Sequence, residues 1–323
     1  MALSYEFSIG SVRAKENSLF TGSDIEHMLG CKNISELCRY LNDKGYGEGS
    51  DIETIIKNNT SELWSYLRSV APDFKIFAPF IYINDIHNLK AVLKGIMSDR
   101  KFKSLILEPY TISPDIVVKA VENRNFSLFP EWLSKPADRA YETLAHTSDA
   151  RLSDAILDKA VMEEILKISE KLNSQFVFEY FKTTVFYNNI KIAIRASKTG
   201  TDRDFLNNAF CDVEDFPRQS ITDTALKGIE PLIDLLSKLS AYECSKAVDE
   251  YKISPSAFER FVDNKLIIMA KESCKRAGEG AEPLMGYLIG REAEKKIIRI
   301  IANGLRTDSG LETIRERLRE IYG

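Results

Sequence analysis

Residues 80–98 read FIYINDIHNLKAVLKGIMS, and the chain repeats the pattern of this stretch twice. The second copy, residues 181–197, reads FKTTVFYNNIKIAIRAS, and the third, residues 289–305, reads IGREAEKKIIRIIANGL. When the copies are aligned, positions i, i+3, i+4 and i+7 are apolar in each, apart from Ser197. This spacing is that of one face of an α-helix, so the pattern predicts the same amphipathic helix three times.

Polar residues also recur beside the apolar face. A basic residue occupies one position in all three copies, an asparagine precedes it by two residues in the first two, and a second basic residue follows it by four in the same two. These seven residues are our structural or interface candidates: Asn88, Lys90, Lys94, Asn189, Lys191, Arg195 and Arg299. The basic residues have two possible roles: pairing with a carboxylate that joins two helices, or facing a cavity or a partner.

The spacing between copies indicates how the chain is organised. Successive basic positions lie 101 and 108 residues apart, which is too long for a tetratricopeptide or HEAT array. We therefore predict three similar helical modules, over residues 1–109, 110–211 and 212–323. The alternative is that the repeated pattern is simply common among amphipathic helices.

The composition is that of a globular protein with 44% hydrophobic and 28% charged residues. A net charge of −4 argues against a general nucleic-acid-binding protein, which needs a basic surface. No apolar run approaches the roughly 20 residues of a membrane span, and residues 1–16 lack the pattern of a signal peptide. We expect a cytoplasmic protein whose five scattered cysteines are buried and reduced.

Helix-start signals occur along the whole chain. Ser23, Asn33, Ser254 and Ser309 each precede an apolar-periodic segment, as N-cap residues do. Residues 105–112, LILEPYTI, read either as a short strand or as an irregular crossing segment, and we favour the second. No stretch shows convincing strand alternation, so the predicted fold class is all-α.

Motifs for catalysis are missing from the sequence. There is no phosphate-binding G-x-x-x-x-G-K-[ST] loop and no G-x-S-x-G elbow, and the three histidines form no metal-binding motif. Asp85 and His87 are two residues apart and would point to different faces of a helix. Acidic pairs such as Glu292 and Glu294 lie among lysines and apolar residues, as on a solvated helix face. We predict no catalytic residue, no metal site and no cofactor.

The repeated helix carries a family resemblance. Residues 84–90, NDIHNLK, resemble the N-D-Φ-x-N-Φ signature of the central-stalk C subunit of bacterial and archaeal V-type (A-type) ATPases, which corresponds to the d subunit of the eukaryotic V-ATPase. Residues 189–191 look like the family's second N-Φ-(K/R) site. Residues 290–299 are similar to its R-E-x-E-x-x-N-Φ-R segment, with Ile297 in place of the asparagine.

The resemblance implies three helical modules in a funnel around a pseudo-threefold axis. Its wide end would sit on the proteolipid c-ring in the membrane, and its cavity would receive the shaft made by the D and F subunits. The implied function is non-catalytic: a peripheral rotor part, on the cytoplasmic face, that couples shaft and ring during H⁺ or Na⁺ transport or ATP synthesis. It would bind no nucleotide or nucleic acid and would contact the membrane only through the ring.

Two other hypotheses stay open at this point. The chain could be an unrelated all-helical protein–protein adaptor, or an enzyme whose ligands converge from distant helices. The sequence does not indicate the coupling ion or whether ATP is made or consumed.

Overall fold

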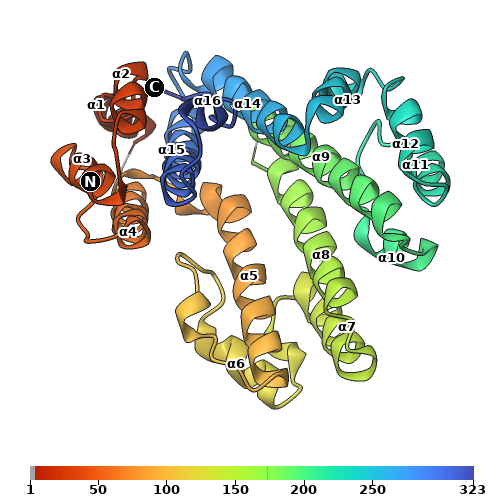
Figure 1. The fold of residues 1–323 in the computed structure, drawn as a ribbon. Helices are drawn as coiled ribbons and strands as arrows, with labels where there is room; N and C mark the ends of the chain where they lie inside the picture. Colours follow the sequence, from red (N-terminus) through yellow and green to blue (C-terminus); the bar gives the residue numbers. More distant parts are fainter. Residues whose placement is uncertain (1–3, 173) are drawn as a thin grey trace. The chain divides into compact units, whose positions relative to one another are not determined.

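The computed structural model describes residues 4–172 and 174–323, and these residues form helices joined by turns and irregular segments (Figure 1). No β-strand occurs among them, which confirms the predicted all-α class. The α-helices are α1 (Tyr5–Glu16), α2 (Gly22–Leu29), α3 (Ile34–Asp43), α4 (Ile52–Val70), α5 (Ala78–Met97), α6 (Pro114–Glu122), α7 (Glu131–Thr147), α8 (Ala150–Glu170), α9 (Gln175–Thr199), α10 (Arg203–Ala209), α11 (Arg218–Ala225), α12 (Ile229–Leu236), α13 (Cys244–Ile253), α14 (Pro255–Cys274), α15 (Glu282–Arg306) and α16 (Leu311–Arg315).

The three copies of the key pattern are helical, within α5, α9 and α15. Their apolar faces are buried, as the spacing predicts: Leu89, Ile190 and Ile298 are each at most 1% exposed. No described helix combines the length and the apolarity that a membrane crossing requires. Residues 105–112 lie between helices and contain no strand, in agreement with the favoured interpretation.

The chain divides into two compact units. One unit comprises Met1–Phe74 with Lys246–Gly323, and the other comprises Lys75–Ser245. The predicted division into three modules, and their arrangement as a funnel, stay predictions.

In the first unit, α15 is the central helix. It packs against α1, α3, α4, α14 and α16, and its buried residues include Leu284, Ile289 and Ile301. Helices α2 and α3 contribute Met28 and Leu37 to the same apolar core. Burying apolar side chains of this size contributes roughly 1.5–3 kcal/mol each, so this core holds the chain's two ends in one unit.

In the second unit, α8 is the central helix. It packs against α5, α7, α9 and α10, and α7 and α8 lie side by side as an antiparallel pair (Figure 1). Aromatic contacts join α5 to α9 at Phe80 and Phe181, whose ring centroids are 5.1 Å apart. The α5 helix therefore has one face on the unit's core and leaves another face for the chain that follows it.

The three key helices also end in the same way. A residue with left-handed φ follows each helix: Asp99 (φ 50°), Gly200 (φ 67°) and Asp308 (φ 49°). The next amide then donates to a carbonyl five residues earlier, at 2.8 Å in the first copy, 3.4 Å in the second and 2.9 Å in the third. These positions lie 101 and 108 residues apart, the same offsets as in the sequence repeat.

The helix starts confirm some sequence predictions and correct others. Asn33 and Ser254 are N-caps whose side chains accept amide hydrogen bonds. Ser23 is not a cap: Thr21 has the extended conformation that a cap needs and forms the capping box with Asp24. Likewise, Gly310 rather than Ser309 precedes α16.

Candidate interaction surface on the repeated helix

Asn88 anchors the chain that follows α5. Its side-chain Nδ2 donates to the carbonyl of Leu107 at 3.0 Å, and its Oδ1 accepts from the Leu107 amide at 2.8 Å. Asn88 is fully buried, and buried polar groups need hydrogen-bond partners. Its side-chain amide and the backbone amide and carbonyl of Leu107 satisfy each other. The candidate asparagine of the first copy is therefore a backbone anchor.

Three neighbours of Asn88 on α5 bind the same segment. Asn84 donates to the carbonyl of Pro109 at 2.9 Å, and Nε2 of His87 lies 2.9 Å from the carbonyl of Leu105. Asp85 accepts from the amide and hydroxyl of Thr111, at 2.8 and 2.5 Å, and from the amide of Ile112 at 3.1 Å. We call residues 105–112 the first anchored segment.

The pKa of the Asp85 carboxyl group departs from its ordinary value. Burial raises the pKa of Asp85 above its ordinary value, and the hydrogen bonds from Thr111 and Ile112 oppose this rise. The sequence placed Asp85 and His87 in the family signature of residues 84–90 but predicted no contact for either side chain. The available signal for their role was four polar residues among positions 84–88, directly after the apolar and aromatic residues 79–83.

Asn189 repeats the anchor in the second copy. Its Nδ2 donates to the carbonyl of Cys211 at 2.8 Å, and its Oδ1 accepts from the Cys211 amide at 3.1 Å. Asn189 and Cys211 are both buried. We call residues 210–216 the second anchored segment.

The third copy replaces the asparagine with Ile297, which is buried in the apolar core of the first unit. The chain after α15 is held instead from α14. Asn264 accepts from the Glu320 amide at 2.9 Å, and Asp263 pairs with Arg319 at 2.7 Å. An apolar side chain thus replaces the amide, and a neighbouring helix supplies the polar contacts.

Two candidate lysines join α5 to α8. Lys90 pairs with Asp158, and Lys94 pairs with Asp154 at 2.5 Å. The two carboxylates lie one helical turn apart, as do the two lysines, so the pairs fix the register of one helix against the other. Exposed pairs of this kind contribute only roughly 0.2–1 kcal/mol each.

The other basic candidates have different surroundings. Arg299 on α15 pairs with Glu53 on α4 at 2.9 Å. Lys191 is half-buried on α9, whereas Arg195 is exposed and has no carboxylate partner within the part of the chain that the structure describes. Whether any of these seven candidates contacts a partner protein stays a prediction.

Apolar side chains project outward from the first anchored segment. Leu105, Leu107 and Tyr110 are 52%, 42% and 38% exposed. Arg100, Lys101 and Lys103 come just before them and are exposed as well. The second anchored segment differs, because Phe210 and Phe216 are buried and its exposed residues are acidic.

Known proteins resemble this chain over nearly its whole length. The sequence model of the family "ATP synthase (C/AC39) subunit" matches residues 8–317. The chain belongs to this family. The C subunit of the V-type sodium ATPase of Enterococcus hirae is 21% identical over 96% of this chain and 97% of its own length. The C subunit of the A-type ATP synthase of Methanocaldococcus jannaschii is 22% identical over 97% of this chain and 86% of its own.

Membership in the ATP synthase (C/AC39) subunit family identifies the chain as a subunit of a V-type or A-type ATPase. The resemblance seen in the repeated helix is therefore not accidental. This excludes the hypothesis of an unrelated adaptor. In this family member, the residues that carried the likeness in the first two copies are the backbone anchors Asn88 and Asn189.

A buried ion pair lies in the third family-like segment. Arg291 donates to Glu294 at 2.8 Å, and Glu294 also accepts from the Phe20 amide at 2.5 Å. Burial raises the pKa of Glu294, while the Arg291 guanidinium opposes the rise. Glu294 is 2% exposed, so the prediction of a solvated face for Glu292 and Glu294 is wrong for Glu294.

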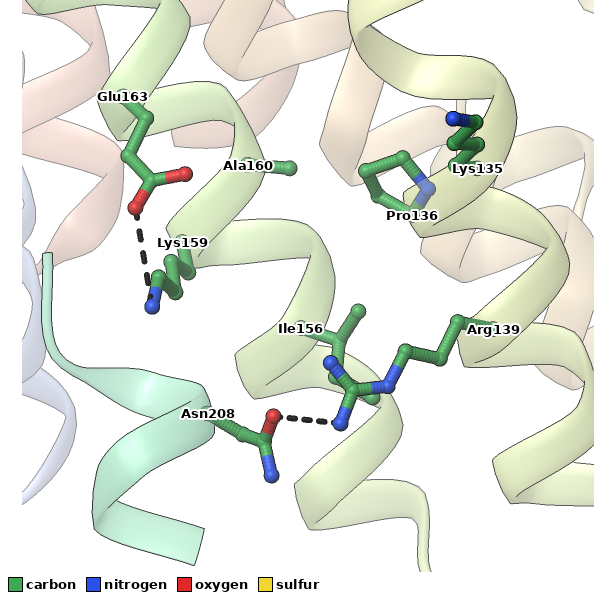
Figure 2. A pocket seen from close by; sticks show the side chains of 8 residues that line it. All are labelled: Lys135, Pro136, Arg139, Ile156, Lys159, Ala160, Glu163 and Asn208. Carbon is green, nitrogen blue, oxygen red and sulfur yellow. Dashed lines mark hydrogen bonds and ion pairs between the residues drawn. The ribbon is translucent and has the colours of Figure 1, made fainter.

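A shallow pocket of about 240 Å³ lies between α7, α8 and α10 (Figure 2). Figure 2 shows the Arg139 guanidinium turned toward Asn208, at 2.6 Å, and Lys159 turned toward Glu163, at 3.7 Å. Lys159 also donates to the carbonyl of Asn207 at 3.3 Å, near the C-terminal end of α10. Lys159 therefore places positive charge at a helix C-terminal end, where it is favoured, and Arg139 binds a side chain of the same helix, so these contacts do not define a ligand site.

The cysteine thiols of this chain are buried, and its possible metal ligands are dispersed among the described residues. All five cysteines are free and buried, and burial raises the pKa of Cys211 and of Cys244 to about 12 each. Among the described residues, no three His, Cys, Asp or Glu side chains are grouped as a metal site would need. The feature that we consider further is instead the first anchored segment, which four side chains of α5 bind.

Proposed function

We propose that this chain is the non-catalytic central-stalk subunit that couples the D–F shaft to the membrane proteolipid ring. The observation that carries the proposal is the family match over residues 8–317, together with relatives named as C subunits that the chain covers almost completely. The coupling role is an inference from this membership. In that role the protein would lie on the cytoplasmic face and would reach the membrane only through the ring.

The packing of each unit suits a part that transmits torque. Such a part needs helices that do not slide past one another. In the second unit, α5 is joined to α8 by Lys90 with Asp158 and by Lys94 with Asp154, in addition to apolar packing. In the first unit, α15 is buried along most of its length and is linked to α4 through Arg299 and Glu53.

A binding titration tests the proposal. The purified chain is titrated with the D–F pair and, separately, with membranes that contain the proteolipid ring. We expect it to bind both and to bind no ATP. Failure of a folded chain to bind either one of these two partners would overturn the proposed function.

A further inference from the structure

The surface beside α5 combines positive charge with exposed apolar side chains. We call it the basic–apolar strip, and it consists of Arg100, Lys101, Lys103, Leu105, Leu107 and Tyr110. Between residues 100 and 110 the chain has three cations and one carboxylate, Glu108, and Asp99 directly precedes the strip. The backbone groups of Leu105 and Leu107 bind α5, while the side chains of both residues are exposed.

The backbone of the apolar part of the strip is held by hydrogen bonds from α5. The α5 side chains bind the backbone of residues 105–112 through the hydrogen bonds of Asn84, Asp85, His87 and Asn88. The turn that precedes it lies on Gly95, where an added Cβ would come within 2.4 Å of the Phe102 ring and 3.0 Å of the Arg100 carbonyl. A preorganised surface loses less conformational entropy on binding than a mobile loop does.

The charges of the strip have no partners within the described residues. No carboxylate forms an ion pair with Arg100, Lys101 or Lys103 there, although Lys90 and Lys94 on the preceding helix α5 are both paired. Three cations beside three exposed apolar side chains complement a surface that offers carboxylates around an apolar crevice. In the second anchored segment two of the three carboxylates are paired within the unit, Asp212 with Arg218 and Glu214 with Lys182.

We propose that the basic–apolar strip is a docking site for an acidic protein surface with an apolar crevice, and that this surface belongs to the proteolipid ring. The choice of the ring rests on the proposed function. The chain would contact the ring at the ring's water-exposed loops. Because these loops are polar, we expect the contact to depend on charge. The shaft has to be gripped without slipping, so its contact is expected to be mainly apolar.

Two variants test the strip in the full-length chain. The first, Leu105→Ser with Leu107→Ser, removes the apolar part, and its matched control is Leu226→Ser with Leu311→Ser, which alters exposed leucines elsewhere. The second replaces Arg100, Lys101 and Lys103 with Gln, and its control makes the same replacement at the exposed Lys135, Lys171 and Lys227, giving the same change in net charge. All substituted residues are exposed, so the thermal midpoints are expected to change little.

The probes are ring-containing membranes, vesicles of the same lipids without the ring, and the D–F pair. The leucine variant is expected to bind ring membranes at least tenfold more weakly than the wild type. The charge variant is expected to bind about tenfold more weakly at low salt and to approach the wild type at high salt. Both controls should stay within about twofold of the wild type, and binding to the D–F pair should be unchanged.

Other outcomes would overturn the assignment. Loss of D–F binding with ring binding intact would place the shaft on the strip. Equal binding to ring-free vesicles would identify lipid as the partner, and unchanged binding of both variants would show that the strip is not a docking site. If the wild type fails to bind ring membranes, the proposed function itself is overturned, whereas ring binding that both variants leave unchanged overturns only the assignment of the strip.

Discussion

The two anchored segments of the second unit have the same backbone arrangement and opposite outer surfaces. Asn88 exchanges two hydrogen bonds with the backbone of Leu107, and Asn189 does the same with Cys211. The anchored residue follows its asparagine by 19 positions in the first copy and by 22 in the second. The repeat has therefore kept the device that folds the chain back onto the helix.

What differs is the side of the segment that faces away from the helix. The second segment buries Phe210 and Phe216, and two of its three carboxylates are paired, with Arg218 and Lys182. The first segment exposes Leu105, and the basic residues just before it have no carboxylate partners among the described residues. The second segment is thus covered by its own unit, whereas the first leaves the apolar and basic side chains exposed that the proposed docking site requires.

The largest difference between the copies is expected when each anchor is removed. Asn189→Ala leaves the buried amide and carbonyl of Cys211 without partners, so we expect it to lower the free energy of unfolding by about 3 kcal/mol. Asn88→Ala should cost only about 1–2 kcal/mol, because the Leu107 backbone lies in a more exposed segment that water can reach. Urea unfolding followed by circular dichroism measures both losses.

A neighbouring asparagine supplies the control for this experiment. Asn188 precedes the anchor, and its side chain contacts the sulfur of Met162, at 3.9 Å. Asn188→Ala is expected to cost less than about 1 kcal/mol. Equal losses for Asn88→Ala and Asn189→Ala would contradict the view that the second segment is the more deeply integrated of the two.

The Cys211 thiol reports whether the second anchor has opened. Burial raises the pKa of this thiol to about 12, so in the folded wild type at pH 8 it is protonated and shielded from reagents. A loss of local stability of about 3 kcal/mol in Asn189→Ala should speed labelling of Cys211 on the order of a hundredfold. Peptide mass spectrometry separates Cys211 from the other cysteines, and Asn88→Ala should leave its labelling rate nearly unchanged.

A smaller effect, of opposite sign in the two segments, is expected with pH. Burial raises the pKa of Asp85, so its contribution to stability is present below its ordinary value of 3.8 and is lost as pH rises through the raised value. The hydrogen bond from Lys182 lowers the pKa of Glu214, so its contribution is present above 4.5 and is lost as pH falls through the lowered value.

The measurement is the difference in unfolding free energy between the wild type and each neutral variant, from about pH 3 to pH 6. For Asp85→Asn the wild-type advantage should shrink as pH rises, and for Glu214→Gln it should grow. Slopes of the same sign would show that the two carboxylates have similar environments, contrary to the structure.

The sequence predicted the helices far better than it predicted the anchors. A repeat of apolar residues is a local signal, and α5, α9 and α15 lie where it placed them. The roles of Asn88 and Lys90 depend on chain segments 19 and 68 residues further on, which local periodicity does not reveal. Glu294 was misjudged for the same reason, because the Phe20 amide that it binds comes from the other end of the chain.

The smallest expected effect concerns the residue that ends each key helix. Asp99 and Gly200 hold the same left-handed conformation, which costs a residue with a Cβ more than it costs glycine. An added Cβ at Gly200 would meet no atom within 4 Å, so Gly200→Ala should lose about 1 kcal/mol through backbone conformation alone. Asp99→Gly should gain about 0.5 kcal/mol, since aspartate tolerates this conformation better than alanine does. Thermal unfolding of the two variants measures both changes.

If Asp99→Gly lowers stability, the Asp99 side chain makes a contribution that the shared backbone geometry does not explain, and the two helix ends are less alike than their φ angles indicate.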